Sequence, residues 1–532
     1  MTTPAIRVLV ADTIHEQGVA HLRANPGFQV DTANGMTEAE LVEKLGDYDA
    51  LIVRSKTKVA APAIRVGAKR LRIIGRAGIG VDNIDTVCAT EHGIFVCNTP
   101  DSNATTTAEL AIAHLFSLSR NLPRADKSMR AGEWTPAKFV GAEVSGKTVG
   151  IIGFGTIGRI FAGRALSLTM HVLAFDPLVT PKVFEEHGVE RCELEDLLKR
   201  ADYISLHCPL VEKTSNLLDA THLAMMKPGA RIINCARGGI IDEAALYDAL
   251  KGGHLAGAAL DVFADEPPKS SPLLTLDNVV LTPHLGASTE EAQTAVSLKI
   301  AETIATYLST GVVNDAINVP RVPAELVSKA HPYRGLARAL GSLIAELSGG
   351  AISGLEVNLH GRAADLDART ITSEAIAGVL SRSLEVKVNE VNAAALAKRQ
   401  GIAISESRSQ EMQDYVSLIE LRAKTANGTT TVAGTLLGEK QPRIVQIDDY
   451  EVEAVPEGLM LFTRHDDRPG VVGALGGILG REGINISRMQ IGAAAGKTES
   501  IALIGIARPL NDAALEEIRK LSAIKQALQI EL

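Results

Sequence analysis

Short apolar runs rich in β-branched residues recur through the first 310 residues, and stretches with helical spacing of apolar positions separate them. Alternation of buried strands with helices is typical of parallel α/β sheets. About ten strands exceed one ordinary doubly wound sheet, so the pattern predicts two such sheets. The predicted strands are IRVLVAD, FQVDTA, DALIVRS, RIIGRAG, VGIIGFG, HVLAFDP, YISLHCP, RIINCARG, HLAGAALDVF and VVLTPHL.

Two long helices are predicted to connect these sheets. The first covers residues 102–121, and the second starts at Ser288, where Glu291 follows three residues after a capping serine. If the chain passes from one sheet to the other through the first helix and returns through the second, one domain is discontinuous. It then comprises residues 1–100 and 286–318, and residues 101–285 form the other domain.

The pattern changes after residue 318. Residues 319–455 mix helices with short strands such as LEVNLHG and TTTVAGTLLG, and we expect an α+β intervening domain there. Residues 456–532 follow the order β-α-β-β-α-β, which is the ferredoxin-like plan. The predicted fold class is therefore α/β, with two Rossmann- or flavodoxin-like doubly wound domains followed by these two smaller domains.

Composition narrows the class of protein. Among 532 residues, 46% are hydrophobic and 22% charged, and no apolar run approaches the length of a membrane span. The first apolar stretch is too short for a secretory signal, so we expect a soluble cytoplasmic protein. A net charge of −9 argues against nucleic acid as a partner, and five scattered cysteines without a close CxxC pair predict no metal site.

A glycine motif indicates a dinucleotide. In GIIGFGTIG, Gly153, Gly155 and Gly158 stand between a predicted strand and helix, where backbone can approach a pyrophosphate at the helix N-terminus. The next strand ends in Asp176, whose carboxylate can accept hydrogen bonds from the adenosine ribose and would repel a 2′-phosphate. Because Pro177 rather than arginine follows, NAD is favoured over NADP.

Three charged or titratable side chains come directly after predicted parallel strands: Arg237, Glu266 and His284. Open α/β sheets bind ligands at this edge, so these groups should converge near the nicotinamide. Oxidation of a 2-hydroxy acid needs a base for the hydroxyl proton, which suits His284, and a carboxylate such as Glu266 would orient the imidazole. Arg237 could hold the substrate carboxylate and polarise the carbonyl oxygen.

The segments GFGTIG, NCARGGIID, LDVFADEPP and TPHLGAST together resemble the D-isomer-specific 2-hydroxyacid dehydrogenases over residues 1–318. The resemblance implies that Arg237, Glu266 and His284 are the catalytic set and that Asp261 lies near the nicotinamide carboxamide. It makes residues 101–285 the NAD-binding domain and the discontinuous domain the substrate-binding one. Further implied NAD contacts are Thr156, Ile157, Cys208, Cys235, Gly286 and Ala287.

The C-terminal 210 residues resemble the extension of long-form members of that family, which act on 3-phosphoglycerate and carry an intervening domain and an ACT domain. LIVRSKTKV and IIGRAGIGVDN match their substrate loops, implying Arg54, Ser55 and Arg76 around the phosphate. The implied reaction produces 3-phosphohydroxypyruvate and NADH as the first step of L-serine synthesis.

The segment HDDRPGVVGALGGILGREGINI matches the start of an ACT domain and implies L-serine as a feedback effector, with contacts from His465, Asp467 and Asn485. A dimerisation module without an effector is the alternative, since Asp467 could cap a helix. Two dimer-prone modules predict a homo-oligomer, a dimer or tetramer.

Some long-form members carry a basic cluster after IVQI, whereas this chain reads IVQIDDY, so we do not expect regulation by an anion there. Two other functions stay open: a D-2-hydroxyacid dehydrogenase acting on glyoxylate, lactate or glycerate, and a non-enzymatic NAD-sensing scaffold.

Overall fold

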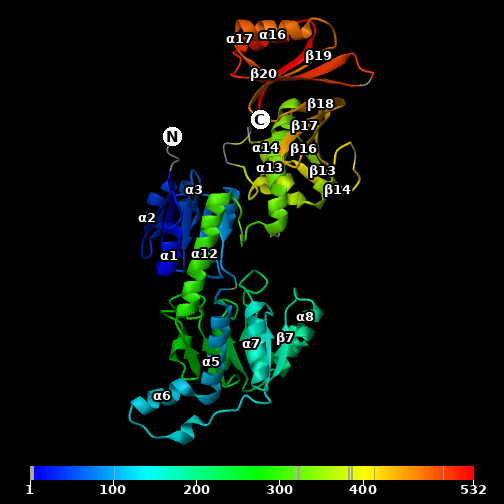
Figure 1. Ribbon diagram of the computed structural model, residues 1–532. Coiled ribbons are helices and arrows are strands. Elements are labelled where there is room, and N and C mark those ends of the chain that lie inside the picture. Colours follow the sequence, from blue (N-terminus) through cyan, green and yellow to red (C-terminus); the bar gives the residue numbers. More distant parts are fainter. Residues whose placement is uncertain are drawn as a thin grey trace.

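The computed structural model describes residues 5–100, 102–313, 315–319, 324–381, 384, 388–412, 414–494 and 496–532. Two α/β lobes are followed by an intervening domain and a C-terminal domain, stacked in one elongated molecule (Figure 1). The two doubly wound sheets predicted from the apolar runs are both present, which confirms the fold class.

The first lobe is built on a five-stranded parallel sheet of order β2-β1-β3-β4-β5. Its strands are β1 (Ile6–Val10), β2 (Phe28–Thr32), β3 (Ala50–Val53), β4 (Ile73–Arg76) and β5 (Phe95–Cys97). Its helices are α1 (Glu16–Arg23), α2 (Glu38–Lys44), α3 (Ala61–Gly67), α4 (Thr86–Glu91) and, returning from far along the chain, α12 (Glu290–Thr310). Ile300 and Ile304 of α12 join the buried core of this lobe, so the lobe is assembled from two separate segments of chain.

The second lobe holds a seven-stranded parallel sheet of order β12-β11-β10-β9-β6-β7-β8. Its strands are β6 (Thr148–Ile152), β7 (His171–Phe175), β8 (Glu190–Arg191), β9 (Tyr203–Leu206), β10 (Arg231–Asn234), β11 (Gly257–Leu260) and β12 (Val279–Leu281). Its helices are α5 (Ala104–Arg120), α6 (Leu122–Arg130), α7 (Thr156–Ser167), α8 (Pro181–Glu186), α9 (Leu194–Arg200), α10 (Ala220–Met225) and α11 (Glu243–Lys251). Strand order reverses between β6 and β9, and the crevice beyond such a reversal is where open α/β sheets bind ligands.

The long helix predicted over residues 102–121 is observed as α5, but the predicted start of α12 is wrong by one residue. The helix is capped by Thr289, whose side chain accepts a hydrogen bond from the Ala292 amide, and not by Ser288. Both hydroxyl residues precede acidic residues of the first helical turn, so the local sequence does not determine which of them caps the helix.

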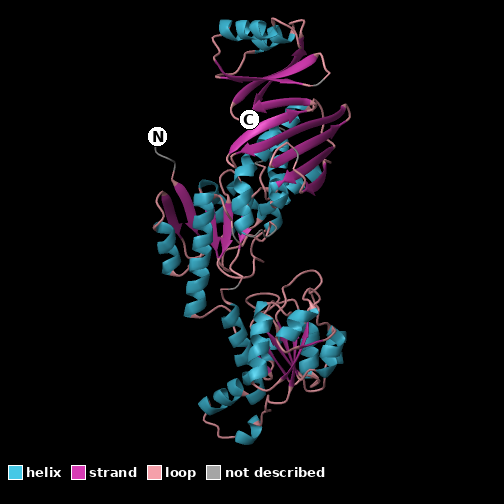
Figure 2. Ribbon diagram, turned by 45° about the vertical axis from the view of Figure 1, so that its right-hand side comes forward, coloured by secondary structure: helices cyan, strands magenta, loops and turns pink. Residues whose placement is uncertain are grey.

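The intervening and C-terminal domains share one ten-stranded sheet of order β14-β13-β15-β16-β17-β18-β20-β21-β19-β22. The intervening part contains β13 (Gly354–Gly361), β14 (Ala403–Ser409), β15 (Ser417–Thr425), β16 (Gly428–Leu437), β17 (Gln441–Ile447), β18 (Tyr450–Ala454), α13 (Ala324–Leu347), α14 (Ala368–Leu380) and α15 (Ala393–Arg399). The last part contains β19 (Leu459–Asp466), α16 (Val471–Arg481), β20 (Ile486–Ala493), β21 (Glu499–Ile506), α17 (Asp512–Arg519) and β22 (Ile524–Glu531). Its two helices lie on one face of its strands (Figure 2), which confirms the ferredoxin-like prediction.

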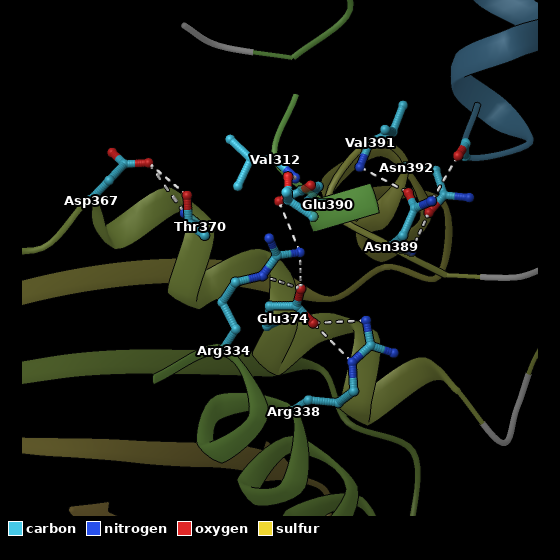
Figure 3. Close-up of polar contacts among 12 residues, drawn as sticks. Val312, Arg334, Arg338, Asp367, Thr370, Glu374, Asn389, Glu390, Val391 and Asn392 are labelled. Carbon is cyan, nitrogen blue, oxygen red and sulfur yellow. Dashed lines mark hydrogen bonds and ion pairs between the residues drawn. The ribbon is translucent and has the colours of Figure 1, made fainter. Parts of the chain in front are cut away.

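Polar contacts join the intervening domain to the first lobe (Figure 3). Asn389 donates to the carbonyl of Gly93 at 2.7 Å, and beside this contact the carboxylate of Glu374 bridges the guanidinium groups of Arg334 and Arg338. The Glu374 side chain is only 6% exposed, and Glu390 approaches Arg334 at 3.3 Å. A buried charge needs such partners, so this network stabilises the packing of α13 against α14 next to the domain contact.

Candidate active site

A cavity of about 410 Å³ lies between the two lobes, at the edge of the second sheet where its strands end. Residues from both lobes line it, because the loop after β4 faces the loops after β9, β10 and β12 across the crevice. The lining residues are Arg76, Ile79, Gly80, Val81, Asp82, Asn103, Thr107, Ile157, His207, Cys208, Pro209, Leu210, Cys235, Ala236, Arg237, His284, Gly286 and Ala287.

The imidazole of His284 and the carboxylate of Glu266 form a close pair at this cavity. Nδ1 of His284 lies 2.8 Å from Oε2 of Glu266, and both side chains are about 40% exposed. Burial raises the pKa of Glu266, but its hydrogen bond and ionic contact with His284 and a bond from the Phe263 amide outweigh this, and the pKa lies below its usual value. Glu266 is therefore a carboxylate at neutral pH and can accept a hydrogen bond from Nδ1–H of His284, which leaves Nε2 to act as a base.

The loop that carries His284 is held from below by Asp261, which is fully buried. The carboxylate of Asp261 accepts hydrogen bonds from the Thr282 hydroxyl and from the amides of Leu285 and Gly286, at 2.6–2.9 Å. The backbone of His284 has φ = 55°, a conformation that costs energy in a residue other than glycine. Asp261 thus fixes a strained loop that presents the imidazole, a task that the resemblance did not assign to it.

Arg237 enters the cavity from the loop after β10. Asn234, the last residue of that strand, donates to the Arg237 carbonyl and accepts from the Ala236 amide, so the loop conformation is fixed at both ends. Nε of Arg237 donates to Asp82 of the first lobe at 2.8 Å, and Nη1 donates to the carbonyl of Ala236. The guanidinium therefore bridges the two lobes.

The residues expected at the substrate phosphate lie at the ends of β3 and β4. Arg76 lines the cavity, whereas Arg54 and Ser55 stand on the neighbouring loop, whose backbone is held by the buried carboxylate of Asp12. Burial, together with the positive charges of Arg237 and Arg54, lowers the pKa of Arg76 to about 10. The positive charges of Arg237 and Arg54 thus act on the buried Arg76, and a multiply charged anion would relieve this repulsion.

The glycine turn fits a dinucleotide. Gly153 has φ = 95°, and a Cβ at Gly158 would lie 2.2 Å from the Gly153 carbonyl, so neither position accepts a larger residue without rearrangement. Gly155 faces open space directly before α7, which begins at Thr156 and has no side-chain cap. Backbone amides at a helix start suit a pyrophosphate.

Asp176 follows β7 beside this turn and accepts hydrogen bonds from the amides of Phe154 and Leu178 at 2.8 and 2.9 Å. Its carboxylate is thereby held next to the turn. Of the other expected NAD contacts, the structure brings into the cavity Ile157, Cys208, Cys235, Gly286 and Ala287.

Several lining residues were missed in the sequence. His207 follows β9 directly, so the strand-end rule that found His284 could have found it; burial lowers its pKa to about 3, and its Nε2 lies 2.9 Å from the Ser205 hydroxyl. The strand-end rule could not have found Asn103, which lies at the N-cap position of α5, or Asp82, which reaches the cavity from the first lobe. Oδ1 of Asn103 is buried without a hydrogen-bond partner among the described residues.

The expected effector residues lie far along the chain, in the C-terminal domain. His465 belongs to β19 and is buried, with Nδ1 at 3.2 Å from the Thr463 hydroxyl, and burial lowers its pKa. Asp467 and Asn485 are exposed, in the loops before α16 and before β20. The loop with Asp467 precedes α16 and the loop with Asn485 follows it, so only Asp467 lies near the start of the helix.

Within the described part of the chain, no three His, Cys, Asp or Glu side chains gather as a metal site. No helix there combines the length and apolar character needed to cross a membrane.

Comparison with known protein families assigns the second lobe, the intervening domain and the C-terminal domain. Residues 112–286 match the family described as D-isomer specific 2-hydroxyacid dehydrogenase, NAD binding domain. Residues 329–448 match the D-3-phosphoglycerate dehydrogenase intervening domain, and residues 459–523 match the ACT domain.

Relatives match over the whole length. The chain is 41% identical to the D-3-phosphoglycerate dehydrogenase of Synechocystis, over 99% of this chain and 95% of the relative, and 40% identical to that of Methanocaldococcus jannaschii, over 99% and 100%. A solved glyoxylate reductase from Paecilomyes thermophila is 28% identical, covers 59% of this chain and 99% of its own, and has a TM-score of 0.55. The glyoxylate reductase thus matches part of this chain, whereas the two D-3-phosphoglycerate dehydrogenases match over nearly all of it. The chain belongs to the D-3-phosphoglycerate dehydrogenases within the NAD-binding D-isomer-specific 2-hydroxyacid dehydrogenase family.

Proposed function

We propose that this protein oxidises 3-phosphoglycerate to 3-phosphohydroxypyruvate with reduction of NAD⁺, the first step of L-serine synthesis. The observation that carries the proposal is the pair of His284 and Glu266, 2.8 Å apart at a cavity that Arg237 and Arg76 also line. An acid–base pair and two cations at one crevice suit an anionic 2-hydroxy acid.

In this mechanism Nε2 of His284 accepts the proton of the substrate hydroxyl, while hydride leaves the carbon atom that carries this hydroxyl. When bound, NAD⁺ supplies the acceptor for that hydride. Glu266 holds Nδ1 and stabilises the imidazolium that forms, because the two groups are already in contact at 2.8 Å. Arg237 binds the substrate carboxylate and the oxygen of the reacting carbon through the N–H donors of its planar guanidinium. Hydrogen bonds from the Asn234 side chain to the loop keep the Arg237 backbone in place.

The phosphate of the substrate is assigned to Arg54, Ser55 and Arg76. Support comes from the pKa of Arg76, which burial and then the charges of Arg237 and Arg54 lower; a phosphate at this place would offset that repulsion. A lactate or a glycolate offers no such group. The names of the full-length relatives also favour this substrate over the smaller 2-hydroxy acids.

We further propose L-serine as an effector bound at the ACT domain by His465, Asp467 and Asn485, in a cytoplasmic homo-oligomer. Support for self-association is a group of exposed apolar side chains on and after α6, which projects from the second lobe (Figure 1). Apolar side chains gathered on one projection favour a protein partner. They are Leu122, Met129, Trp134 and Val140, which are 52–81% exposed.

The test is NADH formation from equal concentrations of 3-phosphoglycerate, glycerate, lactate and glycolate, each with and without L-serine. We expect turnover of 3-phosphoglycerate to dominate and L-serine to reduce it. Replacement of His284 by alanine should lower kcat by about 100-fold or more. Preference for an unphosphorylated acid, or an His284→Ala variant as active as the parent, would overturn the assignment. Sedimentation velocity tests the oligomer, and a monomer alone would refute it.

A further inference from the structure

Asp82 stands in the first lobe, in the loop between β4 and α4, and contacts a residue of the second lobe. Its Oδ2 accepts a hydrogen bond from Nε of Arg237 at 2.8 Å, and the Arg237 side chain is 25% exposed. The contact spans the crevice and belongs to the cavity lining on both sides. We propose, on the basis of the function above, that Asp82 is a positioning residue for the reaction and aligns Arg237 with the substrate when the lobes close on each other.

The orientation of the guanidinium supports this role. Nε is bound by Asp82 and Nη1 by the Ala236 carbonyl, so two of its five N–H groups fix the plane of the group and others remain for the substrate. Two hydrogen bonds from different nitrogens hold the orientation of a planar group more firmly than one does, and the bond to Asp82 is charge-assisted. Without Asp82, the second lobe alone would hold Arg237 through the carbonyl of its own neighbour.

Gly80 provides the space for this arrangement. A Cβ at Gly80 would lie 1.6 Å from Nη2 of Arg237 and 2.9 Å from Oδ2 of Asp82, so any side chain would displace one of them. The guanidinium therefore lies directly against the backbone of the first lobe. Since Gly80 and Asp82 stand two residues apart, one short loop both makes room for Arg237 and pairs with it.

Electrostatics gives the contact a second consequence. Arg237 and Arg54 both lower the pKa of Arg76, whereas Asp82 acts in the opposite direction on the same group. Asp82 thus acts on two guanidinium groups, that of Arg237 by direct contact and that of Arg76 through its charge. Its negative charge offsets part of the repulsion on Arg76 before an anionic substrate enters.

The experiment compares Asp82→Asn, which keeps an oxygen acceptor, with Asp82→Ala, which removes it. We expect Asp82→Ala to lower kcat/KM for 3-phosphoglycerate by about tenfold and Asp82→Asn by less, while the Kd for NADH stays within twofold of the parent value. Asp196→Asn is the matched control, because it removes an exposed carboxylate from Arg200 on α9, remote from the cavity, and Arg200 keeps Glu190. This control should leave kcat/KM unchanged.

A double-mutant cycle identifies the route of the effect. In an Arg237→Ala background, Asp82→Ala should cost less than twofold, because Asp82 acts through Arg237. Gly80→Ala should reproduce the loss seen for Asp82→Ala with the Kd for NADH again unchanged. A tenfold loss that persists without Arg237, or parental kinetics in Asp82→Ala, would overturn the proposal. Failure of the parent protein to oxidise 3-phosphoglycerate would instead overturn the proposed function.

Discussion

Replacement of Glu266 by glutamine tests the acid–base pair most directly. Glutamine has nearly the same shape and keeps an oxygen that can accept the bond from Nδ1 of His284, but it carries no charge. The expected loss is therefore the electrostatic stabilisation of the imidazolium alone.

Its magnitude follows from the geometry. With Nδ1 and Oε2 at 2.8 Å, the centres of charge are about 4 Å apart, and such a pair is worth about 1 kcal/mol in water and about 4 kcal/mol at a protein surface. The side chains are 41% and 38% exposed, so solvent screens the pair considerably and about 2 kcal/mol is a suitable value. At 1.36 kcal/mol for each factor of ten, kcat should fall by about 30-fold.

The parent enzyme carries the charge that the variant lacks throughout the assay range. Burial raises the pKa of Glu266, but its hydrogen bond and ionic contact with His284 outweigh this and hold the pKa below its usual value. Glu266 is therefore a carboxylate at every pH of the assay, and the comparison measures the loss of that charge.

The assay is initial-rate NADH formation at saturating NAD⁺ between pH 6 and 10, with kcat and KM determined separately. Asp265→Asn is the control, because it removes an exposed carboxylate from the adjacent position and should change kcat by less than about twofold. A Glu266→Gln variant with parental kcat, or an equal loss in Asp265→Asn, would refute the reasoning.

Three other predictions concern other parts of the molecule. Glu374→Ala removes the buried carboxylate that bridges Arg334 and Arg338; because Arg334 keeps Glu390 and Arg338 is 43% exposed, the intervening domain should lose about 2 kcal/mol; hydrogen exchange in α13 and α14 measures it, and unchanged protection would contradict it. Burial raises the pKa of Cys208 to about 11, so only about a thousandth of this side chain is thiolate at pH 8. Its alkylation by iodoacetamide, followed by mass spectrometry, should be more than about 100-fold slower than that of free cysteine. Rapid labelling would contradict this prediction. Asp448→Ala removes a 2.7 Å ion pair to Arg464 of the ACT domain; titration with L-serine should give parental turnover without serine and a higher half-inhibiting concentration, and an unchanged titration would show that this contact does not couple the domains.

The main features of the fold and part of the site could be predicted because they depend on local sequence. Apolar runs define buried parallel strands, and charged residues directly after them must lie at one edge of the sheet. That rule alone brought Arg237, Glu266 and His284 into one group, and the structure places Glu266 and His284 in contact.

Other features depend on contacts between distant segments. Asp82 reaches Arg237 only because the two lobes face each other, a distance of 155 residues along the chain. The buried carboxylate of Asp261 turned out to hold the His284 loop through three hydrogen bonds, which no spacing in the sequence specifies.

The domain contacts indicate how an event in the ACT domain could reach the crevice. The ACT strands continue the sheet of the intervening domain through β18 and β20, and Arg464, next to His465 in β19, pairs with Asp448 across that junction. At the far side, Asn389 of the intervening domain donates to the Gly93 carbonyl, just before β5, which is the neighbour of β4. Because β4 ends in Arg76 and its following loop carries Asp82, a shift of the intervening domain would move the first-lobe half of the cavity relative to Arg237. Regulation in this arrangement would change the alignment of the substrate more than the binding of NAD, so we expect L-serine to lower kcat with little change in the KM for NAD⁺.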